Sequence, residues 1–149
     1  MATIHLPPDF KEFFQLLNSH KVHYLVIGGY AVAYHGYPRA TGDIDIWITT
    51  NPDNAKKIVQ AIKEFGFADP DISEEIFLKE DQVIRMGVPP LRIELLTTIS
   101  GVDFKSCYAN RIDETLDDVT ISFIGLEDLK QNKKASGRHI DLNDLERLP

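Results

Sequence analysis

The sequence contains a single cysteine, Cys107, among its 149 residues. The chain therefore cannot form an internal disulfide or a zinc site of the Cys-Cys type. No apolar run approaches the ~20 residues that cross a bilayer. The first ten residues, MATIHLPPDF, lack the basic start and apolar core of a signal peptide. These absences favour a cytoplasmic protein with no membrane partner.

Positive charge is also scarce, with 16 Lys and Arg against 23 Asp and Glu and a net charge of −7. This balance disfavours a protein that grips nucleic acid over its whole surface, although a local basic patch stays open. It suits a site that holds cations through several carboxylates, but simple solubility would give the same balance. There is no internal repeat, low-complexity tract or flexible linker, so residues 1–149 are expected to form one domain.

Hydrophobic periodicity predicts helices that alternate with strands and then end in a short helical tail. Asn51 is expected to cap one helix, which Gly66 ends, and Asp81-Gln82 is expected to form a hairpin turn. The helices are predicted at Pro8–His20, Tyr30–His35, Pro52–Phe65, Leu126–Ser136 and Asp141–Leu148, and the strands at Val22–Ile27, Asp43–Ile48, Ile76–Lys79, Val83–Met86, Leu91–Leu96 and Val119–Ile124. The fold class is thus α/β (α+β), a sheet covered by helices.

Two carboxylates share one face of the predicted strand DIDIWI. Side chains alternate along a strand, so Asp43 and Asp45 project together, opposite the apolar isoleucines. Two adjacent carboxylates repel unless a cation lies between them, and Mg²⁺ is commonly held by such a pair together with substrate phosphates. The alternative is that both side chains simply face water. Trp47 has the same parity, so it either stacks on a base or packs in the protein.

Gly28 and Gly29 directly follow the first predicted strand and precede a short helix. Glycines let backbone N–H groups approach a ligand closely, and a helix N-terminus favours an anion. Phosphate at Gly28-Gly29 and metal at Asp43 and Asp45 would together accommodate a nucleoside triphosphate. A Gly-Gly pair could equally be a tight turn, and no Walker-type loop occurs in the chain.

A third carboxylate, Glu94, lies in the otherwise apolar strand LRIELL. Burying a charge there is unfavourable unless it is paired. Glu94 could form a salt bridge with Arg92 or another base at a sheet edge. Alternatively, it could join Asp43 and Asp45 as a third metal ligand or act as the base for an attacking hydroxyl.

The segment GGYAVAYHGYPRATGDIDIWI resembles the signature of the DNA-polymerase-β-type nucleotidyltransferase superfamily. That signature runs from a strand through Gly-Gly and a short helix to Arg-x-Thr-x-Asp-x-Asp, with a single carboxylate later. The C-terminal stretch GLEDLKQNKKASGRHIDLNDLERL is similar to small bacterial nucleotidyltransferase-like proteins related to abortive-infection toxins. The resemblance implies a nucleotidyltransferase fold with a mixed β-sheet flanked by helices.

The resemblance also implies roles for individual residues. Asp43, Asp45 and Glu94 would bind Mg²⁺ (or Mn²⁺) and carry catalysis. The nucleotide would be held by Gly28, Gly29, Arg39, Thr41, Lys133 and Arg138. Ile140 stands where a Lys is usual, which could weaken activity. A solvated helix face is the alternative for the basic cluster Lys130, Lys133, Lys134 and Arg138.

The function expected from these patterns is a metal-dependent transfer of a nucleoside monophosphate from a nucleoside triphosphate to an acceptor hydroxyl. The acceptor could belong to a small molecule, a protein or a tRNA. The alternative is a catalytically weak, nucleotide-binding member of the fold. Such a protein would act as a binding module or as one half of a toxin–antitoxin pair with a small partner protein.

Overall fold

A computed structural model describes residues 6–67, 69–88 and 91–149 of the chain. Met1–His5, on which the signal-peptide argument partly rests, lie outside the described residues. Within these ranges, none of the helices combines the length and the apolar character that crossing a membrane requires.

One mixed sheet forms the centre of the described chain, with the strand order β3-β4-β2-β1-β6-β5. Its strands are β1 (Tyr24–Ile27), β2 (Asp43–Ile48), β3 (Val83–Val88), β4 (Leu91–Leu96), β5 (Ile112–Leu116) and β6 (Val119–Phe123). The pairs β2–β4 and β1–β6 are parallel, and the other neighbouring pairs are antiparallel. The predicted mixed sheet is therefore confirmed.

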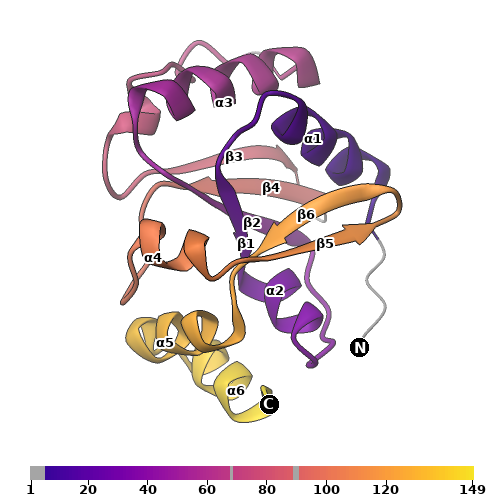
Figure 1. Ribbon diagram of the computed structural model, residues 1–149, viewed down its shortest axis with the longest axis vertical. Coiled ribbons are helices and arrows are strands. Elements are labelled where there is room, and N and C mark those ends of the chain that lie inside the picture. Colours follow the sequence, from indigo (N-terminus) through magenta and orange to yellow (C-terminus); the bar gives the residue numbers. More distant parts are fainter. Residues whose placement is uncertain (1–5, 68, 89–90) are drawn as a thin grey trace.

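Helices lie on both sides of this sheet. They are α1 (Pro8–Ser19), α2 (Gly28–Tyr34), α3 (Pro52–Phe65), α4 (Phe104–Ala109), α5 (Leu126–Ser136) and α6 (His139–Arg147), with a short 3-10 helix, η1 (Ile76–Leu78). In Figure 1, α1 and α3 lie on one side of the sheet, and α2, α4, α5 and α6 lie on the other. The helical C-terminal tail expected from the sequence is present as α5 and α6.

The main hydrophobic core lies between the sheet and the helices α1 and α3. The apolar stripe of α1 is buried, and β2 adds the fully buried side chains of Ile44, Ile46 and Ile48 to the core. Because strand side chains alternate, Asp43 and Asp45 point to the other side of the sheet. Trp47 also points there and packs edge-on against Phe104 of α4, with ring centroids 5.0 Å apart. One strand thus supplies both the core and the acidic face.

Several predicted elements have the expected bounds, because residues at their ends determine where they begin and stop. The Asn51 side chain accepts a hydrogen bond from the backbone N–H of Asn54, and Gly66 ends α3 in a left-handed conformation. Strands β2 and β4 have the predicted ranges, while β1 begins only at Tyr24. Helix α2 begins directly at Gly28, so the two glycines form its first turn and do not precede it.

The predictions between Ile76 and Gln82 were wrong. The apolar run at Ile76–Leu78 forms η1, which buries Phe77 completely against the core and is not part of the sheet that the described residues form. Asp81, with φ of 57°, turns the chain from η1 into β3, so Asp81-Gln82 is not a hairpin turn. Strand β3 pairs with β4 in antiparallel fashion and extends to Val88.

Two elements and one boundary escaped prediction. Neither α4 nor β5 was expected, and β5 joins β6 through Asp117 and Asp118, which both have positive φ. Helix α6 begins at His139, so Asp141 is not its N-cap. The Asp141 carboxylate instead accepts a hydrogen bond from the backbone N–H of Arg138, the residue that precedes the helix.

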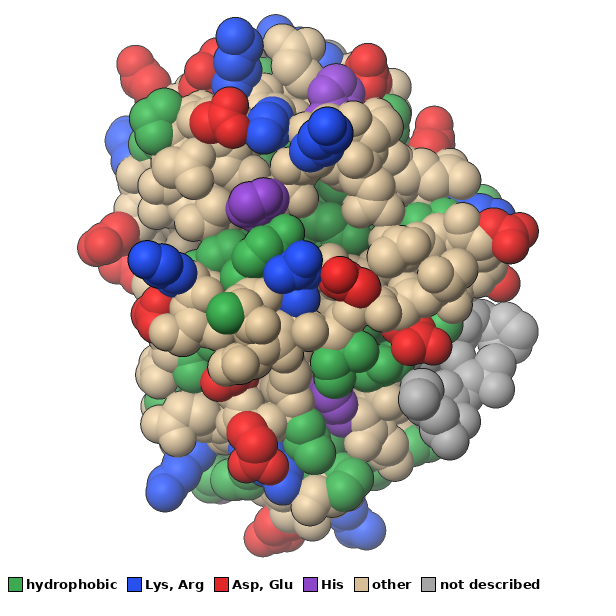
Figure 2. All heavy atoms as spheres, viewed as in Figure 1, with side chains coloured by type: hydrophobic (Ala, Val, Ile, Leu, Met, Phe, Trp, Pro, Cys, Tyr) green, Lys and Arg blue, Asp and Glu red, His purple; other side chains and the backbone are tan. Residues whose placement is uncertain are grey.

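Charged side chains of both signs are mixed on the face of the molecule that Figure 2 shows, without an extended area of one sign. This mixing agrees with the moderate net charge of −7. Any electrostatic attraction for a ligand must therefore come from local groups, because long-range fields of mixed charges largely cancel.

Candidate functional site

The register between β2 and β4 brings three carboxylates to one face of the sheet. Asp45 is the direct partner of Glu94, and Asp43 is the partner of Arg92. Side chains that lie opposite one another on adjacent strands point the same way. Asp43, Asp45 and Glu94 therefore occupy the same face, the side on which α2, α4, α5 and α6 lie.

Arginines already contact two of these carboxylates. A terminal guanidinium nitrogen of Arg92 lies 2.9 Å from Oδ2 of Asp43 and 3.3 Å from Oε1 of Glu94. Arg85 on β3 donates to the same Glu94 oxygen over 3.0 Å. The salt bridge considered for Glu94 is thus present, with Arg85 as a second partner. The Nε atom of Arg92 is buried and has no hydrogen-bond partner among the described residues, so this ion-pair arrangement leaves a donor unsatisfied.

Asp45 is the most perturbed of the three carboxylates. Burial, together with the neighbouring Glu94 and Asp43, raises the pKa of Asp45 to about 7, while the charge of Lys133 acts to lower it. Asp45 and Glu94 are direct partners across β2 and β4, so their side chains lie next to each other. A carboxylate whose pKa is raised to about 7 beside other acidic side chains lies in an environment that a cation would relieve.

These donors have the chemistry that Mg²⁺ or Mn²⁺ prefers, namely carboxylate oxygens from neighbouring strands. In the described ranges, however, no group of three or more His, Cys, Asp or Glu side chains is arranged to hold a metal ion. Arg92 lies between Asp43 and Glu94, and its guanidinium supplies the positive charge there. The residues fit a divalent ion provided that Arg92 moves away from Asp43, and the metal assignment stays a prediction.

Gly28 brings the backbone unusually close to Asp45. It has φ of +66°, and a Cβ atom at this position would collide with the Asp45 carboxylate. Only glycine accommodates both the left-handed conformation and this approach. The junction of β1 and α2 therefore lies directly against the acidic face, where a phosphate could contact it.

Gly29 and Thr41 form a packed contact beside this junction. A Cβ atom on Gly29 would lie 2.9 Å from the Thr41 side chain. The Thr41 hydroxyl donates to the backbone carbonyl of Asp43 over 3.2 Å, which ties the loop to the start of β2. Gly29 thus has a packing role in addition to the phosphate contact expected of it, so a Gly29→Val variant would disturb the loop as well as any ligand.

Lys133 is turned into the protein. Its side chain is only 4% exposed, and its Nζ atom lies 3.1 Å from Asp141 and 3.1 Å from Asp144. Both carboxylates belong to α6 and are fully buried. The charge of Lys133 also acts on Asp45, as stated above for its pKa, so α5 brings this cation close to the acidic face.

Arg39 and Arg138 bind the same two acids from other directions. Arg39 donates to both oxygens of Asp144, over 2.7 and 2.8 Å. Arg138 donates to Asp141 over 2.7 and 3.2 Å, so Asp141 holds Arg138 in place. The Arg138 side chain is nevertheless 72% exposed, unlike that of Lys133. We call Arg39, Lys133, Arg138, Asp141 and Asp144 the ion cluster.

The sequence singled out the three cations of the ion cluster as nucleotide-binding candidates, but it did not predict that Asp141 and Asp144 are buried. Asp141 and Asp144 lie on a polar helix, where acids are normally solvated. Of the remaining basic residues, Lys134 is exposed and Lys130 pairs with Glu127 at 3.9 Å. Those two lysines behave as a solvated helix face.

Other candidates have structural roles. Trp47 is 3% exposed and packs in the protein. A ring nitrogen of His35 bonds to the carbonyl of Ile124 over 2.7 Å, and burial lowers the pKa of this histidine. Cys107 is a free, buried thiol, and burial raises its pKa to about 12, which makes it a poor nucleophile.

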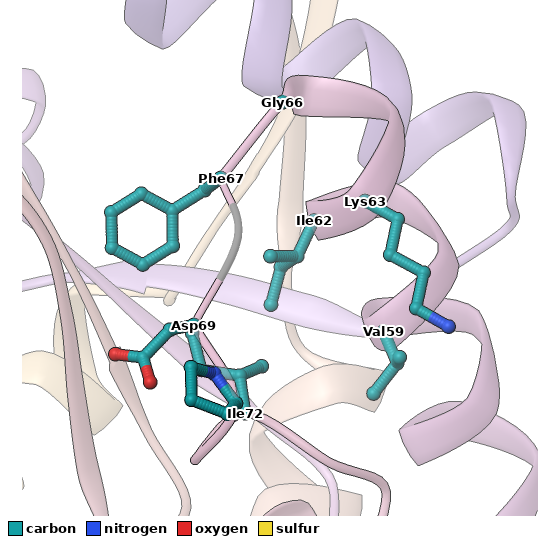
Figure 3. A pocket seen from close by; sticks show the side chains of 8 residues that line it. Val59, Ile62, Lys63, Gly66, Phe67, Asp69 and Ile72 are labelled. Carbon is teal, nitrogen blue, oxygen red and sulfur yellow. The ribbon is translucent and has the colours of Figure 1, made fainter.

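A cavity of about 510 Å³ lies away from the carboxylates, at the end of α3. Figure 3 shows that its lining is largely apolar, with Val59, Ile62, Phe67 and Ile72 around it. Because α3 covers the opposite side of the sheet from Asp45, this cavity is separate from the acidic face.

The fold is that of several nucleotidyltransferase structures. A Thermotoga maritima protein described as a nucleotidyltransferase is similar, with 18% identity, coverage of 91% of this chain and 87% of that one, and a TM-score of 0.60. An antigenic nucleotidyltransferase-like protein from Paracoccidioides brasiliensis has 18% identity, coverage of 92% and 72%, and a TM-score of 0.54. Lincomycin-bound lincosamide antibiotic adenylyltransferase LnuA has 13% identity, coverage of 99% and 97%, and a TM-score of 0.55.

The model of the aminoglycoside-2''-adenylyltransferase family matches residues 9–148. The chain therefore belongs to this family, and the expected nucleotidyltransferase assignment is confirmed. No curated protein matches the chain. The narrower likeness to abortive-infection toxins is not tested by these comparisons and stays a prediction.

Proposed function

We propose that this protein transfers a nucleoside monophosphate from a nucleoside triphosphate to an acceptor hydroxyl at Asp43, Asp45 and Glu94. The observation that carries the proposal is the β2–β4 register, which pairs Asp45 with Glu94. The backbone of Gly28 closely approaches the Asp45 carboxylate at the same place. Membership of an adenylyltransferase family supports the same reaction.

In this reaction the acceptor oxygen bonds to the α-phosphorus, and the bond from that phosphorus to the bridging oxygen breaks. Pyrophosphate leaves with the bonding electron pair, and the hydroxyl proton passes to a carboxylate. Glu94 is suited to accept this proton if it is not a metal ligand. Mg²⁺ or Mn²⁺ held by the carboxylates would polarise the α-phosphate and stabilise the departing charge.

The neighbours of β2 suggest separate sides for the two substrates. Gly28 directly follows β1, Arg39 belongs to the loop before β2 and Lys133 to α5, and these residues would bind the triphosphate. Attacking and leaving oxygens lie roughly in line across the α-phosphorus. The acceptor would then approach over β4 and β3, where Arg85 is 56% exposed.

The family points to ATP as donor and to an aminoglycoside hydroxyl as one acceptor to test. The carboxylates would attract the ammonium groups of such a compound, because opposite charges in a partly desolvated site attract strongly. The positive charges of Arg85 and Arg92 would instead repel these ammonium groups. A lincosamide is a second acceptor to test, because LnuA binds lincomycin. Hydroxyls of proteins and of tRNA ends are the remaining acceptor classes to test.

The test is incubation of the protein with each α-labelled nucleoside triphosphate, Mg²⁺ or Mn²⁺, and each acceptor class. We expect label to appear in one acceptor only when a divalent ion is present. The Glu94→Gln variant should lose this transfer, whereas Glu74→Gln, at an exposed position before η1, should retain it. Transfer that survives Glu94→Gln or chelation of all divalent ions would overturn the proposal.

Nucleotide binding without turnover is the second candidate function. It is favoured by the positions of Arg92 and Arg85, which together pair with Asp43 and Glu94. Ile140, at the position where the resemblance leads one to expect Lys, is 48% exposed on α6 and could contact a small partner protein. Saturable nucleotide binding with no label transfer to any acceptor would support this second function.

A further inference from the structure

The ion cluster connects three separate segments of the chain. Arg39 comes from the loop before β2, Lys133 from α5, and the two acids from α6. Asp144 is fully buried and is shared, because it accepts both N–H groups of the Arg39 fork and also lies 3.1 Å from Lys133. A buried carboxylate without a cationic partner would lower the stability of the fold, so Asp144 needs Arg39 and Lys133 to stabilise its charge.

Each cation of the cluster uses only part of its donor capacity on the acids. A guanidinium has five N–H donors and an ammonium has three. Asp144 takes two from Arg39, and Asp141 and Asp144 together face Lys133. Among the described residues no further acceptor binds either cation, so donors remain for a ligand. A fork held along one edge by a carboxylate presents its other edge in a fixed direction.

These remaining donors lie on the acidic-face side of the molecule. Thr41, two residues after Arg39, is bonded to the backbone of Asp43, and Lys133 is close enough to act electrostatically on Asp45. The three cations and two acids sum to a charge of +1, which favours an anion beside the carboxylates. A polyphosphate is the anion whose oxygens suit both an Arg fork and a Lys ammonium.

We propose that Asp144 is a positioning residue, which holds Arg39 and Lys133 in a fixed geometry so that their remaining N–H groups bind the triphosphate of the substrate. The proposal rests on the proposed function for the identity of that substrate. It assigns no contact with substrate to Asp144 itself. A purely structural role for Asp144 would instead confine its effect to the attachment of α6.

The experiment measures binding of inorganic tripolyphosphate with Mg²⁺, by calorimetry, to the full chain. We expect Asp144→Asn to weaken this binding about tenfold, because a neutral amide cannot hold both cations. The matched control is Glu146→Gln, an exposed acid on the same helix, which should change the affinity by less than about twofold. Circular dichroism at the working temperature verifies that each variant is folded.

A positioning role also predicts non-additivity. In a background of Arg39→Ala with Lys133→Ala, adding Asp144→Asn should change the affinity by less than about twofold, since nothing remains to be positioned. If Asp144→Asn does not fold, Arg39→Lys decides the question. That variant keeps the charge but loses the fork, and it should weaken tripolyphosphate binding in the same direction.

Wild-type affinity in Asp144→Asn or, should that variant not fold, in Arg39→Lys would overturn the inference. So would a loss that persists undiminished in the double-alanine background. Failure of the proposed function would give a different result. Tripolyphosphate would still bind, and Asp144→Asn would still weaken this binding, but no nucleotide would be turned over. Absence of binding to the wild-type chain would overturn the inference as well.

Discussion

Asp45 is the carboxylate of the acidic face whose pKa is raised by both burial and neighbouring negative charge. Its carboxylate is close to Glu94 and Asp43 on one side and under the influence of Lys133 on the other. The sequence predicted this face from the alternation of DIDIWI, because strand parity is a local property. The partners Arg85 and Arg92 depend on the register of three strands, which the sequence alone does not fix.

Replacing Asp45 with Asn should abolish transfer while leaving the protein folded. We expect a fall in kcat/KM of about a thousandfold or more, because one carboxylate of the site is lost. Stability should change by less than about 1 kcal/mol, since the neutral amide also removes repulsion from Glu94. Asp53→Asn, at an exposed acid on α3, is the control. Label transfer within tenfold of wild type would contradict the role of Asp45.

Gly28→Ala should damage the site more than the same change at another left-handed glycine. Gly66 also has positive φ, but a Cβ there meets nothing within 4 Å, whereas at Gly28 it meets the Asp45 carboxylate. We expect Gly66→Ala to cost about 1 kcal/mol in unfolding free energy from backbone strain alone. Gly28→Ala should cost measurably more and should also weaken nucleotide binding. Equal losses in urea unfolding would show that the close approach is unimportant.

At the scale of elements, the sequence predicted the bounds correctly where capping residues mark the ends of a helix. Helix α3 has a capping Asn51, a Pro at its first position and a terminal Gly66. By contrast, η1 resembles a strand in sequence, and only its packing through Phe77 decides its form. The edge strand β5 has no fully buried side chain, so it lacks the apolar alternation that reveals a strand.

Helix α6 shows why the ion cluster could not be predicted. Asp141 and Asp144 are buried although their helix is polar, because Arg39 and Lys133 approach them from elsewhere in the chain and Arg138 from the start of the helix itself. Burial acts to raise the pKa of Asp141, but hydrogen bonds from Arg138, Ser136 and Lys133 outweigh it and hold the pKa well below its usual range. The pKa of Asp144 is lowered in the same way by Arg39 and Lys133.

This arrangement predicts that α6 loses its attachment in acid. A carboxyl whose pKa is lower in the folded state stabilises the fold above its unfolded pKa of about 3.9, and this stabilisation disappears as pH falls through the folded value. Asp141→Asn should therefore cost about 3 kcal/mol at pH 7, with the difference from wild type shrinking below about pH 4. Urea unfolding at several pH values measures this. A difference independent of pH would refute it, and Glu146→Gln should show almost none.

At the scale of the whole molecule, β2 separates stability from chemistry. Its even-numbered side chains, Ile44, Ile46 and Ile48, join the core with α1 and α3, whereas Asp43 and Asp45 face the helices of the other side. The two functions thus lie on opposite sides of one sheet. A loss of packing on the core side should reach the acidic face only through global unfolding, because interiors respond to a cavity mainly in the adjacent side chains.

Phe13→Leu tests this separation. Phe13 on α1 is fully buried and packs edge-on against Phe65 of α3, with ring centroids 5.1 Å apart. The smaller side chain should lower the free energy of unfolding by about 1–2 kcal/mol, while Lys56→Ala, at an exposed position on α3, should change it by less than about 0.5 kcal/mol. Well below the melting temperature, Phe13→Leu should bind nucleotide with the wild-type Kd, because Asp45 and the ion cluster lie across the sheet. A weakened Kd in the fully folded variant would show that the two faces of the sheet are coupled.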